Sequence, residues 1–236
     1  MGLNYGPKIV TSGLILRLDA ADARSYPGSG TTWFDVSGNN NNFSIVAGAY
    51  NSSGPKYMDF NGSYGSAKNS SDISLSDATG VTYVLWTRIK GTGDWRTLTR
   101  SYVNDHHVII WYNGYEIGMY DNDSVGFLGS GLYQDQLPNW GTSNWICLHW
   151  RWQSSSPYYE ISYNDTPETI RGSITNANSR YNRGFGSIGA YHNGSTDPSN
   201  SSQYWGDIAS FSVYNRRLTN AELLQNFNAQ KKRFNL

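Results

Sequence analysis

Several short stretches of the chain alternate hydrophobic and polar residues, with the two-residue period of a β-strand that has one buried face. Residues 81–89 show the pattern most clearly, with Val81, Tyr83, Leu85 and Ile89 on one side. Residues 14–18 predict an opening strand and residues 207–214 a closing one. In the closing strand, the pattern places these residues together on one face: Asp207, Ala209, Phe211 and Val213.

Turn and helix signals divide these strands. Asn113-Gly114 lies between two hydrophobic stretches and predicts a tight β-hairpin. Near the end of the chain the hydrophobic period becomes helical, and Thr219 followed by Glu222 forms a capping box that predicts a helix start. The long polar segment 22–42 is expected to be a loop anchored by Trp33.

Together these patterns predict an all-β protein, a two-sheet antiparallel jelly-roll sandwich with a short C-terminal helix. The chain of 236 residues contains no internal repeat and no linker, so one domain is expected over residues 1–236. Its core is expected at about residues 12–219 and its helix at about residues 219–232.

Composition and charge exclude several classes of function. Eighteen basic and eighteen acidic residues give no net charge, so no overall field attracts nucleic acid or an anionic membrane. Cys147 is the only cysteine, which excludes an intramolecular disulfide, and its hydrophobic surroundings predict burial. The first residues do not read as a signal peptide, and no stretch is apolar enough to predict a transmembrane segment.

The residues do not predict an enzyme. Glycoside hydrolases need two carboxyl groups about 5–9 Å apart, but no glutamate lies two positions from another acid. Asp121 and Asp123 have that spacing, but they lie in what reads as a turn. Zinc-ligand spacings and a Gly-x-Ser-x-Gly elbow are absent from the sequence.

Aromatic residues in polar loops are the stronger functional signal. Sugar-binding sites place an aromatic ring against sugar C–H faces and use nearby polar groups for the hydroxyls. The candidate glycan-binding residues are Trp95, Trp140, Tyr191, His192 and Asn193. The alternative for Trp95 and Trp140 is that they close the ends of the sandwich as core residues.

The order of several motifs resembles the laminin-G-like, concanavalin-A-like jelly-roll family. These motifs include Leu14 to Asp19, Trp33 to Asn42, Met58 to Gly62, Val81 to Arg88, Gly186 to Gly189 and Gly206 to Thr219. The resemblance implies a structural calcium ion, with Asp35, Asn39, Asn41 and Asp207 as its candidate ligands. Ile208-Ala209-Ser210 stands where the family commonly has Ile-Asp-Glu, so a carboxylate is missing from its usual place. The favoured alternative is that Asp35 is a hydrogen-bond acceptor that orders its loop. No other cofactor is expected.

Further segments look similar to the laminin-G-like domains of tailed-bacteriophage structural proteins. They are Leu18 to Asp22, Ser25 to Trp33, Leu224 to Ala229 and Lys232 to Phe234. This resemblance implies a non-catalytic virion protein, a capsid decoration or a tail or neck appendage, made in a bacterial cytoplasm. Its expected partners are other virion proteins, further copies of itself in a homo-oligomer, and weakly a host glycan. The alternatives are a free-standing lectin-like carbohydrate-binding module and, less favoured, a glycoside hydrolase.

Overall fold

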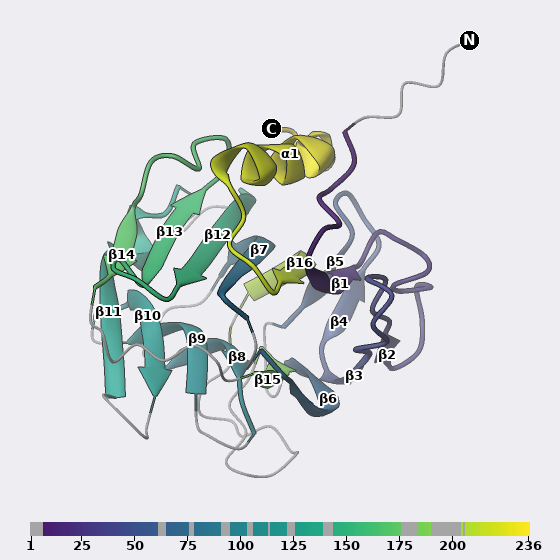
Figure 1. Cartoon of the computed structure of the whole chain (residues 1–236). Coiled ribbons are helices and arrows are strands. Elements are labelled where there is room, and N and C mark those ends of the chain that lie inside the picture. Colours follow the sequence, from purple (N-terminus) through teal and green to yellow (C-terminus); the bar gives the residue numbers. More distant parts are fainter. Residues whose placement is uncertain are drawn as a thin grey trace.

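A computed structural model of the chain describes its backbone in eleven ranges, and side chains at positions 107 and 109–112 are left out of the description. The ranges are residues 7–60, 65–75, 78–90, 95–102, 106–112, 114–121, 126–138, 144–175, 184–189, 204 and 206–236. Two antiparallel sheets pack face to face and one short helix lies near the C-terminus (Figure 1). The predicted two-sheet jelly-roll sandwich is therefore confirmed.

Sheet A is eight-stranded and carries the last strand of the chain near its middle. Its order is β14 (Gly172–Ile174), β13 (Tyr159–Tyr163), β12 (Ile146–Gln153), β7 (Gly80–Ile89), β16 (Gly206–Tyr214), β5 (Tyr57–Asp59) and β4 (Ala49–Asn51), and β1 (Leu14–Asp19) also pairs with β16. Strand β16 thus has β7 on one side and both β5 and β1 on the other.

Sheet B is also eight-stranded and forms the opposite layer. Its order is β11 (Gly126–Tyr133), β10 (Glu116–Asp121), β9 (His106–Tyr112), β8 (Arg96–Arg100), β15 (Phe185–Ile188), β6 (Ser66–Ile73), β3 (Phe43–Ala47) and β2 (Thr32–Trp33). The hairpin predicted around Asn113-Gly114 joins β9 to β10, and a single 3₁₀ turn, η1 (Gln134–Gln136), follows β11.

The main core lies between the sheets and follows the predicted alternation of β7. Val81, Tyr83, Leu85 and Ile89 face this core, as residues 81–89 predicted. Trp33 is fully buried and its ring lies 6.2 Å from that of Phe60, so it anchors the long N-terminal loop as expected.

Strand β16 differs from its predicted pattern in two ways. A register shift between Ile208 and Ser210 marks a bulge, so Ile208 joins Phe211 and Val213 in the main core while Ala209 faces the other side. All nine residues of the strand are buried, where one buried face was predicted. The alternation failed because a bulge moves every following side chain to the opposite face.

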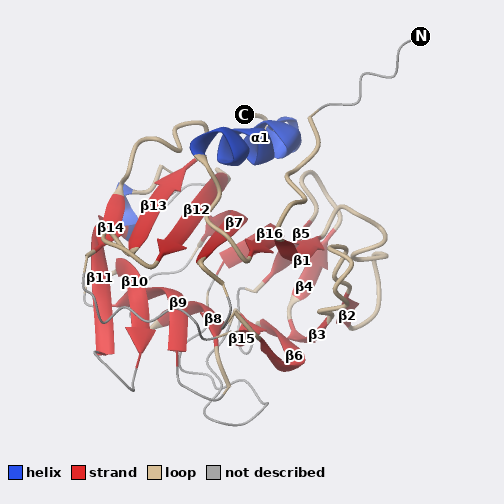
Figure 2. Cartoon of the chain, in the orientation of Figure 1, coloured by secondary structure: helices blue, strands red, loops and turns tan. Residues whose placement is uncertain are grey.

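A second apolar cluster on the outer side of sheet A explains the burial of the other face. The helix α1 (Asn220–Gln230) begins at the predicted capping box, and the 3₁₀ turn η2 (Lys231–Phe234) extends it (Figure 2). Phe227 and Phe234 both stack on Trp86 of β7, with ring centroids 5.5 Å and 4.0 Å apart. The helix is therefore a lid over sheet A, held by apolar contacts.

Buried hydrogen bonds join the N-terminal segment to helix α1 and to strand β16. The Val10 amide donates to Asn226 Oδ1 at 2.8 Å, and the Tyr214 hydroxyl donates to the Val10 carbonyl at 3.0 Å. Arg233 of η2 reaches Asp19 of β1 with a 2.7 Å ion pair. In the described part of the chain, no helix has the length and apolar character to cross a membrane.

Candidate functional site

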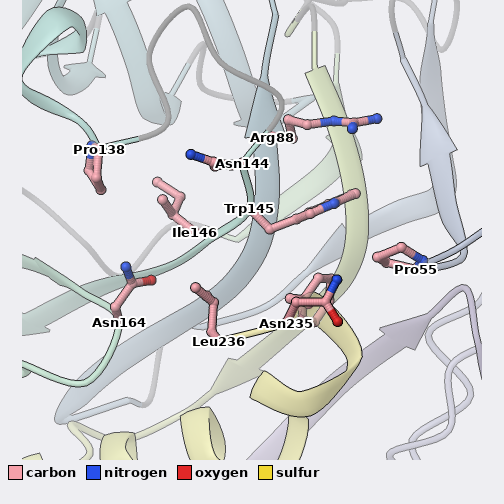
Figure 3. A pocket seen from close by; sticks show the side chains of 10 residues that line it. Pro55, Arg88, Pro138, Asn144, Trp145, Ile146, Asn164, Asn235 and Leu236 are labelled. Carbon is pink, nitrogen blue, oxygen red and sulfur yellow. The ribbon is translucent and has the colours of Figure 1, made fainter.

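A groove of about 480 Å³ opens on the helix side of sheet A, next to the C-terminal turn. The described residues that line it are Pro55, Arg88, Pro138, Asn144, Trp145, Ile146, Asn164, Phe234, Asn235 and Leu236. Figure 3 shows Pro138, Asn144, Ile146, Asn164 and Leu236 around one end, with Trp145 crossing the view between Arg88 and Asn235. Six separate segments of the chain thus meet at this site.

Turn geometry holds two of the three groove asparagines. Asn164 follows β13 with a positive φ of 57°, and its Oδ1 accepts the Cys147 amide proton at 2.9 Å. Asn235 ends η2 with a φ of 59°. Asparagine tolerates this left-handed conformation better than most residues, so both positions suit the residue found there. Asn144 lies two residues before β12.

Stacked aromatic rings form the inner wall of the groove. The Trp145 ring lies 5.2 Å from Phe234 and 5.4 Å from Tyr57. Trp145 and Phe234 keep only 7% and 6% of their surface exposed, because both belong to the cluster under the helix. The wall is therefore apolar and closely packed, and only a small part of the tryptophan is open to the groove.

Arg88 supplies a cation at one end, and its charge is balanced within the protein. Its guanidinium lies 5.0 Å from the Tyr57 ring and 5.1 Å from the Trp145 ring. Arg88 also pairs with the buried Asp207 at 2.5 Å, and Lys90 pairs with the same carboxylate at 2.7 Å. Burial raises the pKa of the Asp207 carboxyl, and hydrogen bonds from Lys90 and Arg88 oppose this shift in part.

The groove is therefore suited to binding by hydrogen bonds and apolar contact. Amide side chains offer both donors and acceptors, Arg88 offers donors, and Trp145 and Leu236 offer apolar surface. None of the described lining residues is acidic. The described lining contains no pair of carboxyl groups that could perform acid–base hydrolysis.

Only one of the tentative glycan residues falls within the described ranges. Trp95 lies at the start of β8 in sheet B, with a φ of 60° and its ring edge-on to Tyr120 at 5.4 Å. It is half-buried and does not line the groove. The other four, Trp140, Tyr191, His192 and Asn193, lie outside the described residues.

The structure brings together three of the four tentative calcium ligands. Asp35 accepts hydrogen bonds from the amides of Arg17, Ser37 and Asn41 and from the Ser37 hydroxyl, all within 3.0 Å. The amide groups of Asn39 and Asn41 donate to the carbonyls of Leu14 and Ile15.

This arrangement does not fit a bound cation. A calcium site needs several oxygens directed at one point, but both Asp35 oxygens are used within the loop and the two asparagines present nitrogens to their partners. Asp207 lies at a different part of strand β16 from Asp35. Asp207 pairs with Arg88 and Lys90 where β16 meets β5. Asp35 instead contacts Arg17, which lies opposite Ser212 further along β16. Asp35 thus acts as the acceptor that orders its loop.

A buried Cys–His pair lies under α1, where it cannot act as a nucleophile. Cys147 Sγ lies 3.4 Å from His149 Nε2, and His149 Nδ1 lies 3.3 Å from the Ser162 hydroxyl. Burial raises the pKa of the thiol well above its usual value, and burial together with Arg151 lowers the pKa of His149 to about 3. All three side chains are fully buried, so no substrate reaches them.

Sequence reasoning missed the groove because its residues are scattered and individually ordinary. The one available signal was Asn144-Trp145, which places an amide next to an aromatic ring directly before a strand. The proximity of Asp59 to Asp207 was missed as well, since the two acids lie opposite each other on neighbouring strands rather than two positions apart on one.

Comparisons with known proteins support the fold. No protein-family model and no curated protein sequence matches the chain. Among solved structures, the binding domain of Paraclostridial Mosquitocidal Protein 1 matches with a TM-score of 0.63 and 13% identity, over 92% of this chain and 52% of that one. Domain 4 of AbnA, an extracellular GH43 arabinanase from Geobacillus stearothermophilus in complex with arabinotriose, matches with a TM-score of 0.57 and 16% identity, over 91% and 98%.

A sialidase from Trypanosoma rangeli, in complex with sialic acid, matches with a TM-score of 0.57 and 14% identity over 94% of this chain. The chain spans about a third of the length of that sialidase, 33%. At these identities the likeness concerns the β-sandwich alone. Both binding domains and chains of glycoside-cleaving enzymes share it.

Proposed function

We propose that this protein is a non-catalytic carbohydrate-binding β-sandwich, with the groove beside Trp145 as its binding site. The observation that carries the proposal is the composition of that groove: three asparagines and an arginine beside an aromatic wall, with no described acid. The arabinanase domain that shares the fold is in complex with arabinotriose, which adds support for the ligand class.

The groove suits a neutral sugar better than a charged one. Amides and a guanidinium can satisfy the many hydroxyls of a saccharide, which needs both donors and acceptors. Arg88 already has Asp207 as its counter-ion, so little free positive charge remains to attract an acidic sugar. The exposed part of Trp145 and the side chain of Leu236 can contact sugar C–H groups.

Binding can be tested with a glycan array of neutral and acidic oligosaccharides that includes arabinotriose, followed by calorimetry on the best neutral ligand. Asn235→Gly is a suitable variant, because glycine keeps the left-handed backbone at φ 59° and removes only the amide. We expect it to weaken binding at least about fivefold. Asn69→Ala on β6 of sheet B is the matched control and should bind as the wild type does.

Two results would contradict the proposal. One is an array on which the wild-type protein binds no saccharide. The other is saccharide binding that Asn235→Gly and Asn144→Ala both leave unchanged, which would place the site elsewhere. An enzymatic role would show as release of reducing sugar from the bound glycan, and we expect no release.

The virion location implied by the resemblance to phage proteins stays a proposal of its own. Sugar binding is compatible with it, since a virion appendage can adhere to a host glycan. Mass spectrometry of phage particles and the mass of the protein in solution test it. We expect the protein in particles and a closed homo-oligomer in solution, and a monomer absent from particles would contradict both expectations.

A further inference from the structure

Tyr115 occupies a backbone conformation that an aromatic residue rarely adopts. The loop between β9 and β10 has three residues, since Tyr112 pairs with Glu116. Gly114 and Tyr115 have φ values of 83° and 70°, both in the left-handed region. Three-residue hairpin loops usually have glycine at the left-handed position before the second strand, because a Cβ there is strained. Tyrosine at position 115 therefore strains the backbone, where glycine would not.

Packing does not explain that strain. Tyr115 is 40% exposed, and it makes no ring contact within the described part of the chain. A strained residue whose ring faces solvent is a reason to suspect a functional role. Among the aromatic side chains that the structure describes, Phe34, Tyr115 and Tyr133 are the exposed ones, and the two tyrosines lie close together.

Tyr133 stands at the end of β11, next to the same loop. It is 39% exposed and lies opposite Glu116 across the β10–β11 pair. The following amide, that of Gln134, donates to the Tyr115 carbonyl at 3.0 Å. This hydrogen bond and the Glu116–Tyr133 pairing place the two exposed tyrosines at neighbouring backbone positions, which form one patch at the end of sheet B.

Glu116 places a fixed carboxylate in this patch. Its Oε1 accepts the Gly131 amide proton at 2.6 Å. A Cβ at Gly129 would lie 2.2 Å from the same carboxylate, so glycine is needed there to make room for it. Two exposed rings beside an acceptor of fixed position are the parts that bind a sugar. The negative charge disfavours acidic sugars.

We infer that Tyr115, Tyr133 and Glu116 form a second contact surface for a neutral saccharide, here called the tyrosine surface. The inference rests on the proposed function, because it assigns the same ligand class. Residues 133–138 connect this surface to the groove, since Tyr133 belongs to the one and Pro138 lines the other. Five residue steps span at most about 18 Å, a distance that a short oligosaccharide can bridge. The protein then binds oligosaccharides more tightly than single sugars.

The test compares a monosaccharide with its oligosaccharides of increasing length, using the best neutral ligand from the array. Tyr115→Gly removes the ring and also relieves the backbone strain. We expect it to weaken oligosaccharide binding about tenfold while leaving monosaccharide binding unchanged. Its midpoint of thermal unfolding should equal or exceed that of the wild type, whereas a structural role for the ring would lower it. Tyr133→Ala should give the same loss, and Phe34→Ala, an equally exposed ring elsewhere, should give none.

The inference and the proposed function fail in different ways. If oligosaccharides bind no more tightly than the monosaccharide, or if Tyr115→Gly and Tyr133→Ala bind them as the wild type does, the tyrosine surface is refuted while the groove stands. If the wild-type protein binds no saccharide, the proposed function is refuted and the tyrosine surface with it. If Tyr115→Gly lowers the unfolding midpoint, the ring has a packing role and the inference from strain is wrong.

Discussion

Replacing Phe227 by alanine should cost about 3 kcal/mol of unfolding free energy. The ring is 3% exposed and lies parallel to Trp86, 13° between planes. Burial of a phenylalanine contributes about 1.5–3 kcal/mol, and a stacked aromatic pair adds about 0.5–1.5 kcal/mol. Phe→Ala substitutions in cores cost about 3–5 kcal/mol, and a site under a surface helix belongs at the lower end because the helix can settle into the space.

Helix α1 depends on this contact more than on its own sequence. Eleven residues are too few for a stable helix in water, so tertiary packing must hold it. Urea unfolding of Phe227→Ala, followed by circular dichroism and tryptophan fluorescence, measures the loss. Leu224→Ala is the matched control on the same helix, since Leu224 is 37% exposed and alanine is the better helix former, and it should change stability by less than about 1 kcal/mol.

A loss below about 1 kcal/mol for Phe227→Ala would refute the reasoning. It would mean that α1 is not held by its stack on Trp86. Equal losses for Phe227→Ala and Leu224→Ala would also refute it, because the two positions differ mainly in burial.

Three further predictions concern buried polar groups. Asp207→Ala should lower the free energy of unfolding by about 3–5 kcal/mol in a urea titration, because it leaves Arg88 without its buried counter-ion. The control is Asp59→Ala, which should lower it by less than about 1 kcal/mol, because the Asp59 side chain is 28% exposed. Cys147 should not react with a thiol reagent in the native protein and should react fully in denaturant, since it is buried and its thiol pKa is raised; rapid native labelling would contradict the burial. The pKa of His149 is about 3 in the folded protein and about 6.5 in the unfolded chain, so the unfolded state binds the extra proton between these values. The free energy of unfolding should therefore fall as the pH drops from 6.5 towards 3, by up to about 1.4 kcal/mol per pH unit. His149→Gln should reduce that slope, and an equal slope in both proteins would contradict the assignment.

Local sequence patterns predicted where the strands and the helix lie. They did not predict the features that depend on contacts between distant segments. The alternation in 81–89 placed each side chain of β7 on its correct face, and the Thr219–Glu222 pair marked the helix start to the residue. The bulge beside Ala209 was not predictable, since it depends on the partner strands of β16 and leaves no trace in the local sequence. The burial of the second face of β16 could not be predicted from the sequence of the strand either, because that burial comes from helix α1 packing over it.

The candidate sites also differ in whether neighbouring residues or distant segments determine them. Asp35 could be singled out from the sequence, because the amides of Ser37 and Asn41 that donate to it lie only 2 and 6 residues away. The groove brings together positions as distant as Pro55 and Leu236, and nothing in either segment indicates the other. The Asn-Gly signal predicted a tight hairpin, but it does not indicate that Tyr115 is a further loop residue with a positive φ.

The position of β16 has a consequence for how the chain folds. This strand lies between β7 on one side and β1 and β5 on the other, although it is made after every other described strand of the two sheets. Until it emerges from the ribosome, no strand joins the three remaining parts of sheet A, which are β14–β13–β12–β7, β5–β4 and β1. The edges that pair with β16 then stay open, and the core between the sheets cannot be completed. Its pairings also join residues about 200 positions apart, as in Leu14 with Tyr214, so loop closure makes folding slow, on the millisecond-to-second scale of high-contact-order β proteins. We therefore expect nascent chains to be prone to aggregation until β16 has been made, and their yield in cells to depend on chaperone capacity.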